Sequence, residues 1–77
     1  MPHEGFFEQG KTYRVKPDID NYRDIQAMFQ GPAVCLNVAK YMGDRYGDFG
    51  DNHGGWWSET LGWSAKLCFE VVEERLK

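Results

Sequence analysis

The chain has 77 residues, of which 42% are hydrophobic and 16% aromatic, and its formal net charge is −3. This length predicts a single domain over residues 1–77, and the apolar content excludes an intrinsically disordered chain. Twelve acidic against nine basic side chains disfavour a broad face for nucleic-acid phosphates, which requires clustered cations.

Cys35 and Cys68 are the two cysteines, and neither belongs to a C-x-x-C pair. The chain has no signal-peptide pattern and no apolar run of about 18 residues. We therefore expect a cytoplasmic protein with two reduced, buried thiols and no membrane association. A single disulfide in a secreted protein is the alternative.

The first regular element is expected over residues 11–16, where polar and apolar side chains alternate. This period of two predicts a half-buried strand with Tyr13 and Val15 facing the core, and Pro17 ends it. Residues 1–10 carry no such pattern and are expected to be loosely held, although their two adjacent phenylalanines could anchor them.

A helix is expected over residues 19–29, since apolar side chains recur there at spacings of three and four. Asp18 or Asp20 can cap its start, and Gly31-Pro32 stops it. The stripe consists of Ile19, Tyr22, Ile25, Met28 and Phe29.

Residues 33–42 are rich in β-branched and apolar side chains and predict a central strand. Its inward face is expected to carry Val34, Leu36 and Val38. The next segment, Gly43–Gly55, holds five glycines with several Asp and Asn residues. This composition is typical of turns, so we expect a long exposed loop or a loose hairpin connection.

The last third of the chain predicts a strand over Trp56–Glu59, a helical turn over Ser64–Leu67 and a closing strand over Cys68–Glu74. The whole pattern indicates an α+β domain, a small twisted antiparallel sheet of four or five strands with one helix packed on it. The expected core is Val15, Tyr22, Ile25, Phe29, Val34, Leu36, Val38, Phe69 and Val71.

The segment from Trp56 to Glu73 resembles the second half of an SH3-like barrel. Such barrels often have a Trp pair on a strand, a turn with Gly, a short 3₁₀ turn near a Ser, and a closing strand. The first strand also resembles that of small bacteriophage-encoded proteins with a G-K-x-Y-[RK]-V opening. The matching residues are Gly10–Val15, Trp56-Trp57, Gly62-Trp63, Ser64–Leu67 and Phe69–Val72.

The chain departs from the peptide-binding members of that family. It has no A-L-Y-D-Y-type segment and no Pro before the closing strand, and the helix replaces their acidic loop. The resemblance therefore implies a small partial barrel without implying polyproline recognition.

No metal site, cofactor site or catalytic residue is expected. The potential zinc ligands His3, His53, Cys35 and Cys68 contain no pair at ligand spacing. The acids of Gly43–Gly55 could hold calcium weakly, but loop solvation accounts for them better. Only the two histidines could serve as near-neutral bases, nothing preorganises a nucleophile beside them, and no phosphate-binding loop is present, so we do not expect an enzyme.

Protein binding is the function that the pattern favours, because all three tryptophans lie between Trp56 and Trp63 and Trp is enriched at binding hot spots. Adjacent strand residues point to opposite faces, so one of Trp56 and Trp57 should be exposed and bind a partner. Trp63 is expected to be structural. The predicted partner-binding residues are Trp56, Trp57, Tyr46, Phe49, Asp44, Asp48 and Asp51.

The resemblance to phage-encoded barrels implies a partner: a larger host protein or complex of defence, nuclease or polymerase machinery that this chain inhibits or modulates. The alternative is a barrel for single-stranded nucleic acid, using exposed Trp and Tyr side chains with Lys11, Arg14 and Lys16. Homodimerisation through the Trp patch would be a competing use of the same surface.

Overall fold

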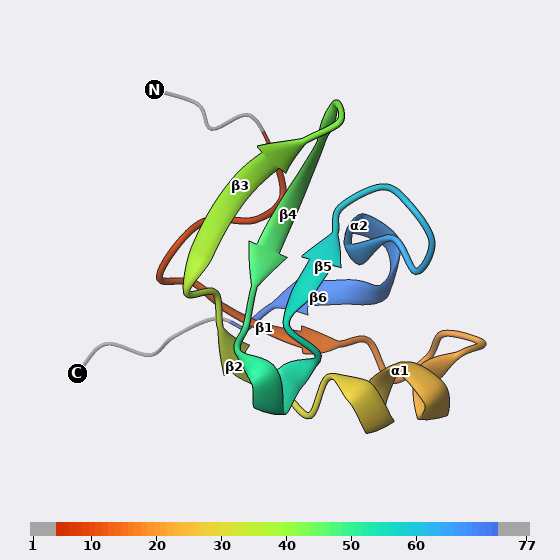
Figure 1. Ribbon diagram of the computed structural model, residues 1–77. Helices are drawn as coiled ribbons and strands as arrows, with labels where there is room; N and C mark the ends of the chain where they lie inside the picture. Colours follow the sequence, from red (N-terminus) through yellow and green to blue (C-terminus); the bar gives the residue numbers. More distant parts are fainter. Residues whose placement is uncertain (1–4, 73–77) are drawn as a thin grey trace.

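The computed structural model describes residues 5–72, and within them the chain forms six strands and a few helical turns (Figure 1). The strands build two antiparallel three-stranded sheets, β2-β1-β6 and β3-β4-β5. This confirms the α+β class but corrects the expected single sheet of four or five strands. The elements are β1 (Thr12–Val15), α1 (Tyr22–Met28), β2 (Ala33–Val34), β3 (Asn37–Tyr41), β4 (Asp44–Asp48), η1 (Asp51–His53), β5 (Trp56–Ser58), α2 (Ala65–Cys68) and β6 (Phe69–Val71).

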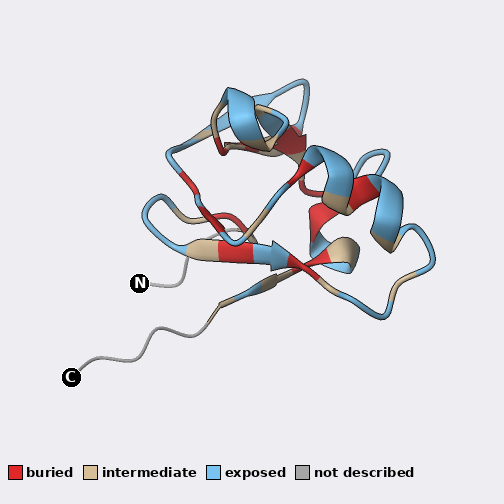
Figure 2. Ribbon diagram, turned by 90° about the horizontal axis from the view of Figure 1, so that it is seen from below, coloured by how far each residue is buried: buried red, intermediate tan, exposed pale blue. Residues whose placement is uncertain are grey.

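The core is a cluster of aromatic rings to which both sheets contribute. Phe29 is central: its ring centroid lies 4.4 Å from that of Phe69, 4.8 Å from that of Phe49 and 5.7 Å from that of Trp57. Figure 2 shows the buried positions of the strands and helices gathered toward the interior. Large rings bury much apolar area per residue, which lets a short chain assemble a core.

The N-terminal segment supplies one of the most deeply buried rings. Phe7 has no solvent exposure, and its ring packs edge-on against Phe49 at a centroid distance of 5.5 Å. Its backbone N–H donates to Glu59 Oε2 at 2.6 Å, and Arg45 Nη2 donates to its carbonyl oxygen at 2.8 Å. The anchoring that the sequence allowed for the two phenylalanines is therefore confirmed, and the start is not loosely held at Phe7. Residues 1–4 of the predicted loose segment lie outside the described residues.

Tyr13 of β1 holds the N-terminal segment in place through two hydrogen bonds of its hydroxyl group. Its hydroxyl donates to the carbonyl oxygen of Phe6 at 2.9 Å and accepts from the backbone N–H of Glu8 at 2.8 Å. Burial disfavours the charged phenolate and raises the pKa of Tyr13 to about 12. The predicted strand over residues 11–16 is confirmed as β1, with Tyr13 and Val15 both buried.

The sequence predicted a long exposed loop or a loose hairpin connection over Gly43–Gly55. The long loop is wrong, because the first part of the segment forms β4, the central strand of its sheet, which pairs with β3 in a hairpin. Gly47 of β4 is buried, and a Cβ at this position would lie 2.8 Å from the ring of Phe7. The space inside Gly47 is therefore filled by the ring of Phe7, from the N-terminal segment. With a glycine at the inward position, β4 shows no apolar alternation, which is why composition suggested a loop.

The predicted strand over residues 33–42 is divided into β2 and β3, and its predicted inward face is wrong for Val34 and Leu36 but right for Val38, which packs against the core. Ala33 and Cys35 are buried, whereas Val34 and Leu36 are 45% and 49% exposed. Because side chains alternate with a period of two, an error of one position before β3 exchanges the two faces there. Small residues face inward because the aromatic rings already fill the interior.

The other expected core positions divide into three groups. Val15, Ile25, Phe29 and Phe69 are buried as predicted, and Tyr22 and Val38 pack against the core from partly buried positions. Val71 is instead 45% exposed.

The helices follow the predictions with shorter limits. The expected helix over residues 19–29 is confirmed as α1 between Tyr22 and Met28, and the helical turn before the last strand is α2. The closing strand β6 ends at Val71, and the last two residues of its predicted range lie outside the described part of the chain. No helix within residues 5–72 has the length and apolar character needed to cross a membrane.

Candidate functional site

The two adjacent tryptophans of β5 point to opposite faces, as the sequence predicted. Trp57 is only 7% exposed and packs against Phe29 and Phe69, and its Nε1–H donates to the carbonyl oxygen of His53 at 2.7 Å. Trp56 is 51% exposed on the outer face of the sheet. Of the pair, Trp56 alone can offer an indole to a partner without unfolding the core.

The strand register places further aromatic side chains on the same outer face. Tyr46 in β4 lies opposite Ala39 in β3 and Ser58 in β5, and Asp48 lies opposite Trp56. Directly opposed residues of an antiparallel pair share a face, so Asp48 lies on the outer face with Trp56. Tyr46 is two residues from Asp48 on the same strand and therefore lies on this outer face as well. Tyr41, at the end of β3, belongs to this face as well.

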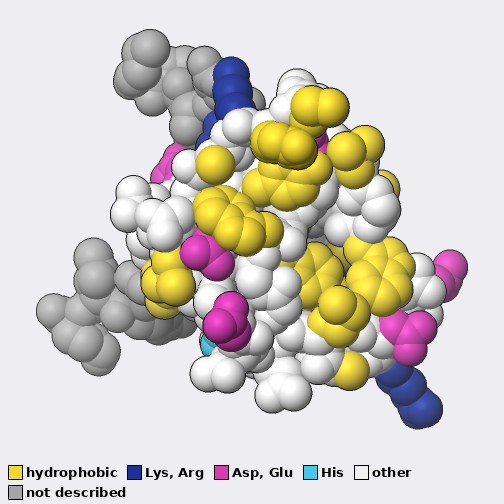
Figure 3. All heavy atoms as spheres, in the orientation of Figure 1, with side chains coloured by type: hydrophobic (Ala, Val, Ile, Leu, Met, Phe, Trp, Pro, Cys, Tyr) yellow, Lys and Arg dark blue, Asp and Glu magenta, His cyan; other side chains and the backbone are white. Residues whose placement is uncertain are grey.

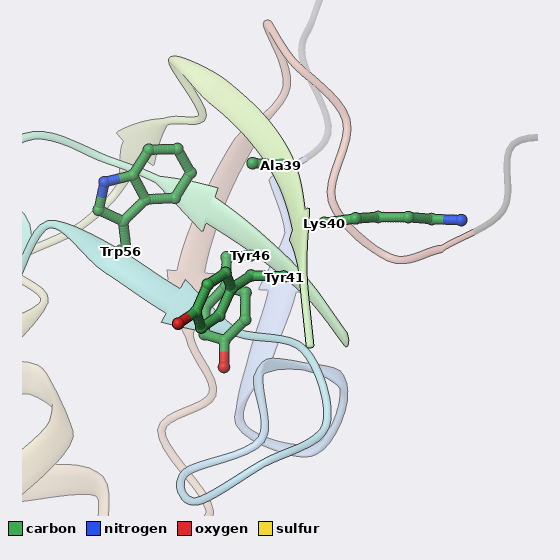
Figure 4. A pocket seen from close by; sticks show the side chains of 5 residues that line it. All are labelled: Ala39, Lys40, Tyr41, Tyr46 and Trp56. Carbon is green, nitrogen blue, oxygen red and sulfur yellow. The ribbon is translucent and has the colours of Figure 1, made fainter. Parts of the chain in front are cut away.

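These side chains line an open groove of about 410 Å³, formed by Ala39, Lys40, Tyr41, Tyr46 and Trp56. The rings of Tyr41 and Tyr46 meet edge to face at a centroid distance of 6.3 Å. Figure 4 shows Trp56 across the strands from the tyrosine pair, while the side chain of Lys40 extends away from the rings. We call this feature the Trp56 groove. In Figure 3 hydrophobic side chains gather on this face, with acidic side chains beside them.

A second, smaller hollow of about 220 Å³ lies on the other side of Trp56. Met28, Leu61 and Trp63 contribute its exposed apolar side chains. Trp63 stacks on Trp57 at a centroid distance of 6.5 Å and an interplanar angle of 19°, yet it stays 36% exposed. Trp63 thus covers the core residue Trp57 from outside and is not itself a core residue. The structural role expected for Trp63 is therefore limited to this stacking contact.

Asp44 was predicted to lie in the exposed segment Gly43–Gly55, but it begins β4 and is almost buried. The hydroxyl of Ser58 donates to its Oδ2, and the hydroxyl of Thr60 donates to its Oδ1 at 2.8 Å. The hydrogen bond from Ser58 is the largest cause, followed by that from Thr60, of an Asp44 pKa below its usual value. Asp44 therefore anchors the chain after β5 to β4, and its oxygens already have donors within the protein.

We predict that Asp44 makes stability depend on pH. A carboxylate whose pKa is lowered by folding stabilises the folded state above its unfolded pKa of about 3.9, and this contribution is lost as pH falls through the folded value. Asp44→Asn should therefore be less stable than the parent protein at pH 7, and the difference should shrink in acid. Urea denaturation at pH 7, 5 and 3 measures it. A difference that stays constant over these pH values would contradict this role.

The other predicted partner-binding residues are dispersed. Phe49 is a core residue with 2% exposure, so it offers no surface. Asp48 is half-buried on the outer face, where its Oδ1 accepts from the backbone N–H of Gly50 at 3.0 Å. Asp51 is exposed in η1, away from the groove lining.

The sequence-based reasoning missed Ala39, Lys40 and Tyr41 as groove residues. They follow from the β3–β4 hairpin, whose turn residues Met42 and Gly43 have φ values of 53° and 85°. Positive φ at both residues of a two-residue turn is the geometry of type I′, and the sequence Asn-Gly is the usual signal for it. In Met-Gly only the glycine favours positive φ, because Met rarely adopts such a φ. The sequence therefore did not predict a two-residue turn at this place.

The described residues contain no group of three or more His, Cys, Asp or Glu side chains that could hold a metal ion. Cys35 and Cys68 are free thiols, the first buried and the second partly buried. The thiol of Cys35 donates to the carbonyl oxygen of Asn37 at 3.3 Å. Desolvation by burial raises the pKa of both thiols, which disfavours the reactive thiolate.

The basic side chains of β1 do not meet the aromatic groove. Arg14 faces outward from the other sheet and pairs with Glu70 at 2.5 Å, and Lys11, just before β1, pairs with Glu8 at 3.6 Å. The core lies between this face and the Trp56 groove, so the cations and the stacking rings do not form one surface.

In comparisons with known proteins, no family model, no curated protein and no solved structure matches the chain. The geometry of the Trp56 groove is thus the basis on which a function can be argued.

Proposed function

We propose that the protein is a small non-enzymatic protein-binding module and that the Trp56 groove is its contact surface. The observation that carries this proposal is the 51% exposure of Trp56 beside the two tyrosines of the same face. Exposing a large indole to water is unfavourable, and Trp and Tyr are the residues most often found to dominate binding energy at protein interfaces.

The groove is also well suited to binding because its backbone is already ordered. The rings project from three hydrogen-bonded strands, and Trp57 holds β5 against the core directly behind Trp56. A preorganised surface loses little conformational entropy on association, so more of the contact energy contributes to affinity.

We propose further that the domain is an SH3-like partial barrel. Only Cys35 and Leu36 separate β2 from β3, so one bent strand passes from the first sheet to the second, as at the corners of packed sheets. The short helix α2 directly precedes the closing strand, in agreement with the resemblance. The likeness to phage-encoded barrels supports inhibition or modulation of a larger host complex.

Binding of single-stranded nucleic acid is the weaker alternative. Asp44 and Asp48 lie on the same face as the aromatic rings, so a phosphate backbone laid across the groove would be repelled. Self-association through the groove is the other competing use of the rings, and it requires no foreign partner.

The test is affinity capture from host lysate at low and high salt with tagged parent protein, Trp56→Ala and Leu67→Ala. Leu67 is an exposed apolar side chain of α2 outside the groove, which makes it a matched control. We expect one protein retained at both salt concentrations by the parent and by Leu67→Ala, and binding weakened by about 2 kcal/mol or more in Trp56→Ala.

Equal capture by Trp56→Ala and the parent would remove the groove from the interface. Recovery of nucleic acid that disappears with salt would favour the alternative instead. Sedimentation of the isolated parent and Trp56→Ala distinguishes self-association, since a dimer that depends on the groove would dissociate in the variant.

A further inference from the structure

The outer face of sheet β3-β4-β5 sets carboxylates beside aromatic rings in a regular pattern. Three alternate residues of β4 point to this face, namely Asp44, Tyr46 and Asp48. The register places Trp56 directly opposite Asp48 and Tyr41 directly opposite Asp44. Opposed side chains have Cβ atoms about 4.5–5.5 Å apart. Each of the two acids is therefore the cross-strand neighbour of an exposed ring.

The two acids differ in what they can still accept. Both oxygens of Asp44 receive hydroxyl donors, and the residue is almost buried. Asp48 is half-buried and uses Oδ1 for the backbone N–H of Gly50, which leaves Oδ2 to accept a donor from outside the chain. The acid with remaining acceptor capacity is thus the one that neighbours Trp56.

A planar cation complements both the exposed rings of this face and the remaining acceptor oxygen of Asp48. The faces of aromatic rings carry negative charge density that attracts cations, and a guanidinium can stack on a ring while its edge donates to a carboxylate. Lys40 is a lining residue, but its side chain extends away from the rings (Figure 4). The cation that complements the rings and Asp48 must then come from a partner.

We propose that the Trp56 groove binds an arginine side chain of the protein partner, with the guanidinium stacked on the ring of Trp56 and donating to Asp48, which lies beside the groove lining opposite Trp56. This inference rests on the proposed function and specifies the chemistry of the contact. Arg is itself enriched at the energetic centre of protein interfaces, which agrees with a single anchoring side chain.

The experiment is an NMR titration of ¹⁵N-labelled protein with the peptide acetyl-Gly-Arg-Gly-Arg-Gly-amide. The same peptide with citrulline in place of arginine is the control, because citrulline has a similar shape without the charge. The indole N–H signal of Trp56, identified by its loss in Trp56→Ala, should shift with the arginine peptide. Citrulline should bind at least about fivefold more weakly, since charge and the cation–π contact are both lost.

Two acid variants complete the test. Asp48→Asn keeps an oxygen for the N–H of Gly50 and should weaken binding of the arginine peptide about threefold to tenfold, whereas Asp51→Asn removes the same charge from η1, where it has no cross-strand ring, and should change it less than about twofold. Equal binding of the citrulline peptide, equal effects of the two variants, or a Trp56 shift caused only by a thymidine decamer would overturn the arginine site. Capture from lysate that requires Trp56 but is unaffected by Asp48→Asn would overturn this inference and leave the protein-binding proposal standing.

Discussion

Replacing Phe7 with alanine is expected to remove a large share of the protein's free energy of unfolding. Phe7 has no solvent exposure, and its ring lies within 6.5 Å, centroid to centroid, of those of Tyr13, Phe49 and Phe69. Truncating a buried Phe costs about 3–5 kcal/mol in lost transfer energy and cavity formation. A domain of this size has only about 4–12 kcal/mol in total.

Urea denaturation followed by circular dichroism measures the effect, and Phe7→Leu and Phe6→Ala serve as controls. Leucine keeps much of the buried volume, and Phe6 is only partly buried, so both variants should stay folded. If Phe7→Ala denatures at the same urea concentration as the parent, the N-terminal segment does not belong to the core.

Trp57→Ala should be the second strongly destabilising change, and Trp63→Ala a much milder one. Trp57 loses its contacts with Phe29 and Phe69 and leaves the carbonyl oxygen of His53 without its indole donor, at a cost of about 3–5 kcal/mol. Trp63 is more exposed and contributes mainly one stacked pair, worth about 0.5–1.5 kcal/mol beyond its buried area.

Far-ultraviolet circular dichroism is the suitable probe for both variants, because removing an indole changes the fluorescence signal itself. Trp56→Ala is the internal control, since its side chain is outside the core, and it should unfold at nearly the same urea concentration as the parent. The assignment fails if the loss of Trp63 destabilises the protein as much as the loss of Trp57.

The sequence predicted those elements whose own side chains alternate or repeat with the correct period. β1, α1 and the closing strand β6 were found in this way, and the alternation of strand side chains also predicted the opposite orientation of Trp56 and Trp57. β4 could not be found, because its inward position is Gly47 and the ring that fills that place belongs to a residue 40 positions earlier in the chain. A local pattern cannot report a contact that the segment itself does not carry.

The candidate site was predicted in the same partial way. The sequence predicted that one tryptophan of the pair is exposed, and the fold shows that it is Trp56. Phe49 and Asp44 are instead buried for reasons that only the fold provides. Asp44 illustrates the difficulty: an acid among glycines is typical of a solvated turn. Its burial depends on hydroxyl donors from Ser58 and Thr60, which lie on a different strand and the turn after it.

The insertion of Phe7 also determines when the chain can fold. The hydrogen bond from Phe7 to Glu59 joins residues 52 positions apart, and β1 pairs with β6 near the other end of the described chain. During synthesis the interior stays open until β5 and β6 have left the ribosome, because neither sheet can close around the ring before then. We therefore expect folding to be slow for a domain of this size and to await β6, and fragments that end before β5 should remain unfolded.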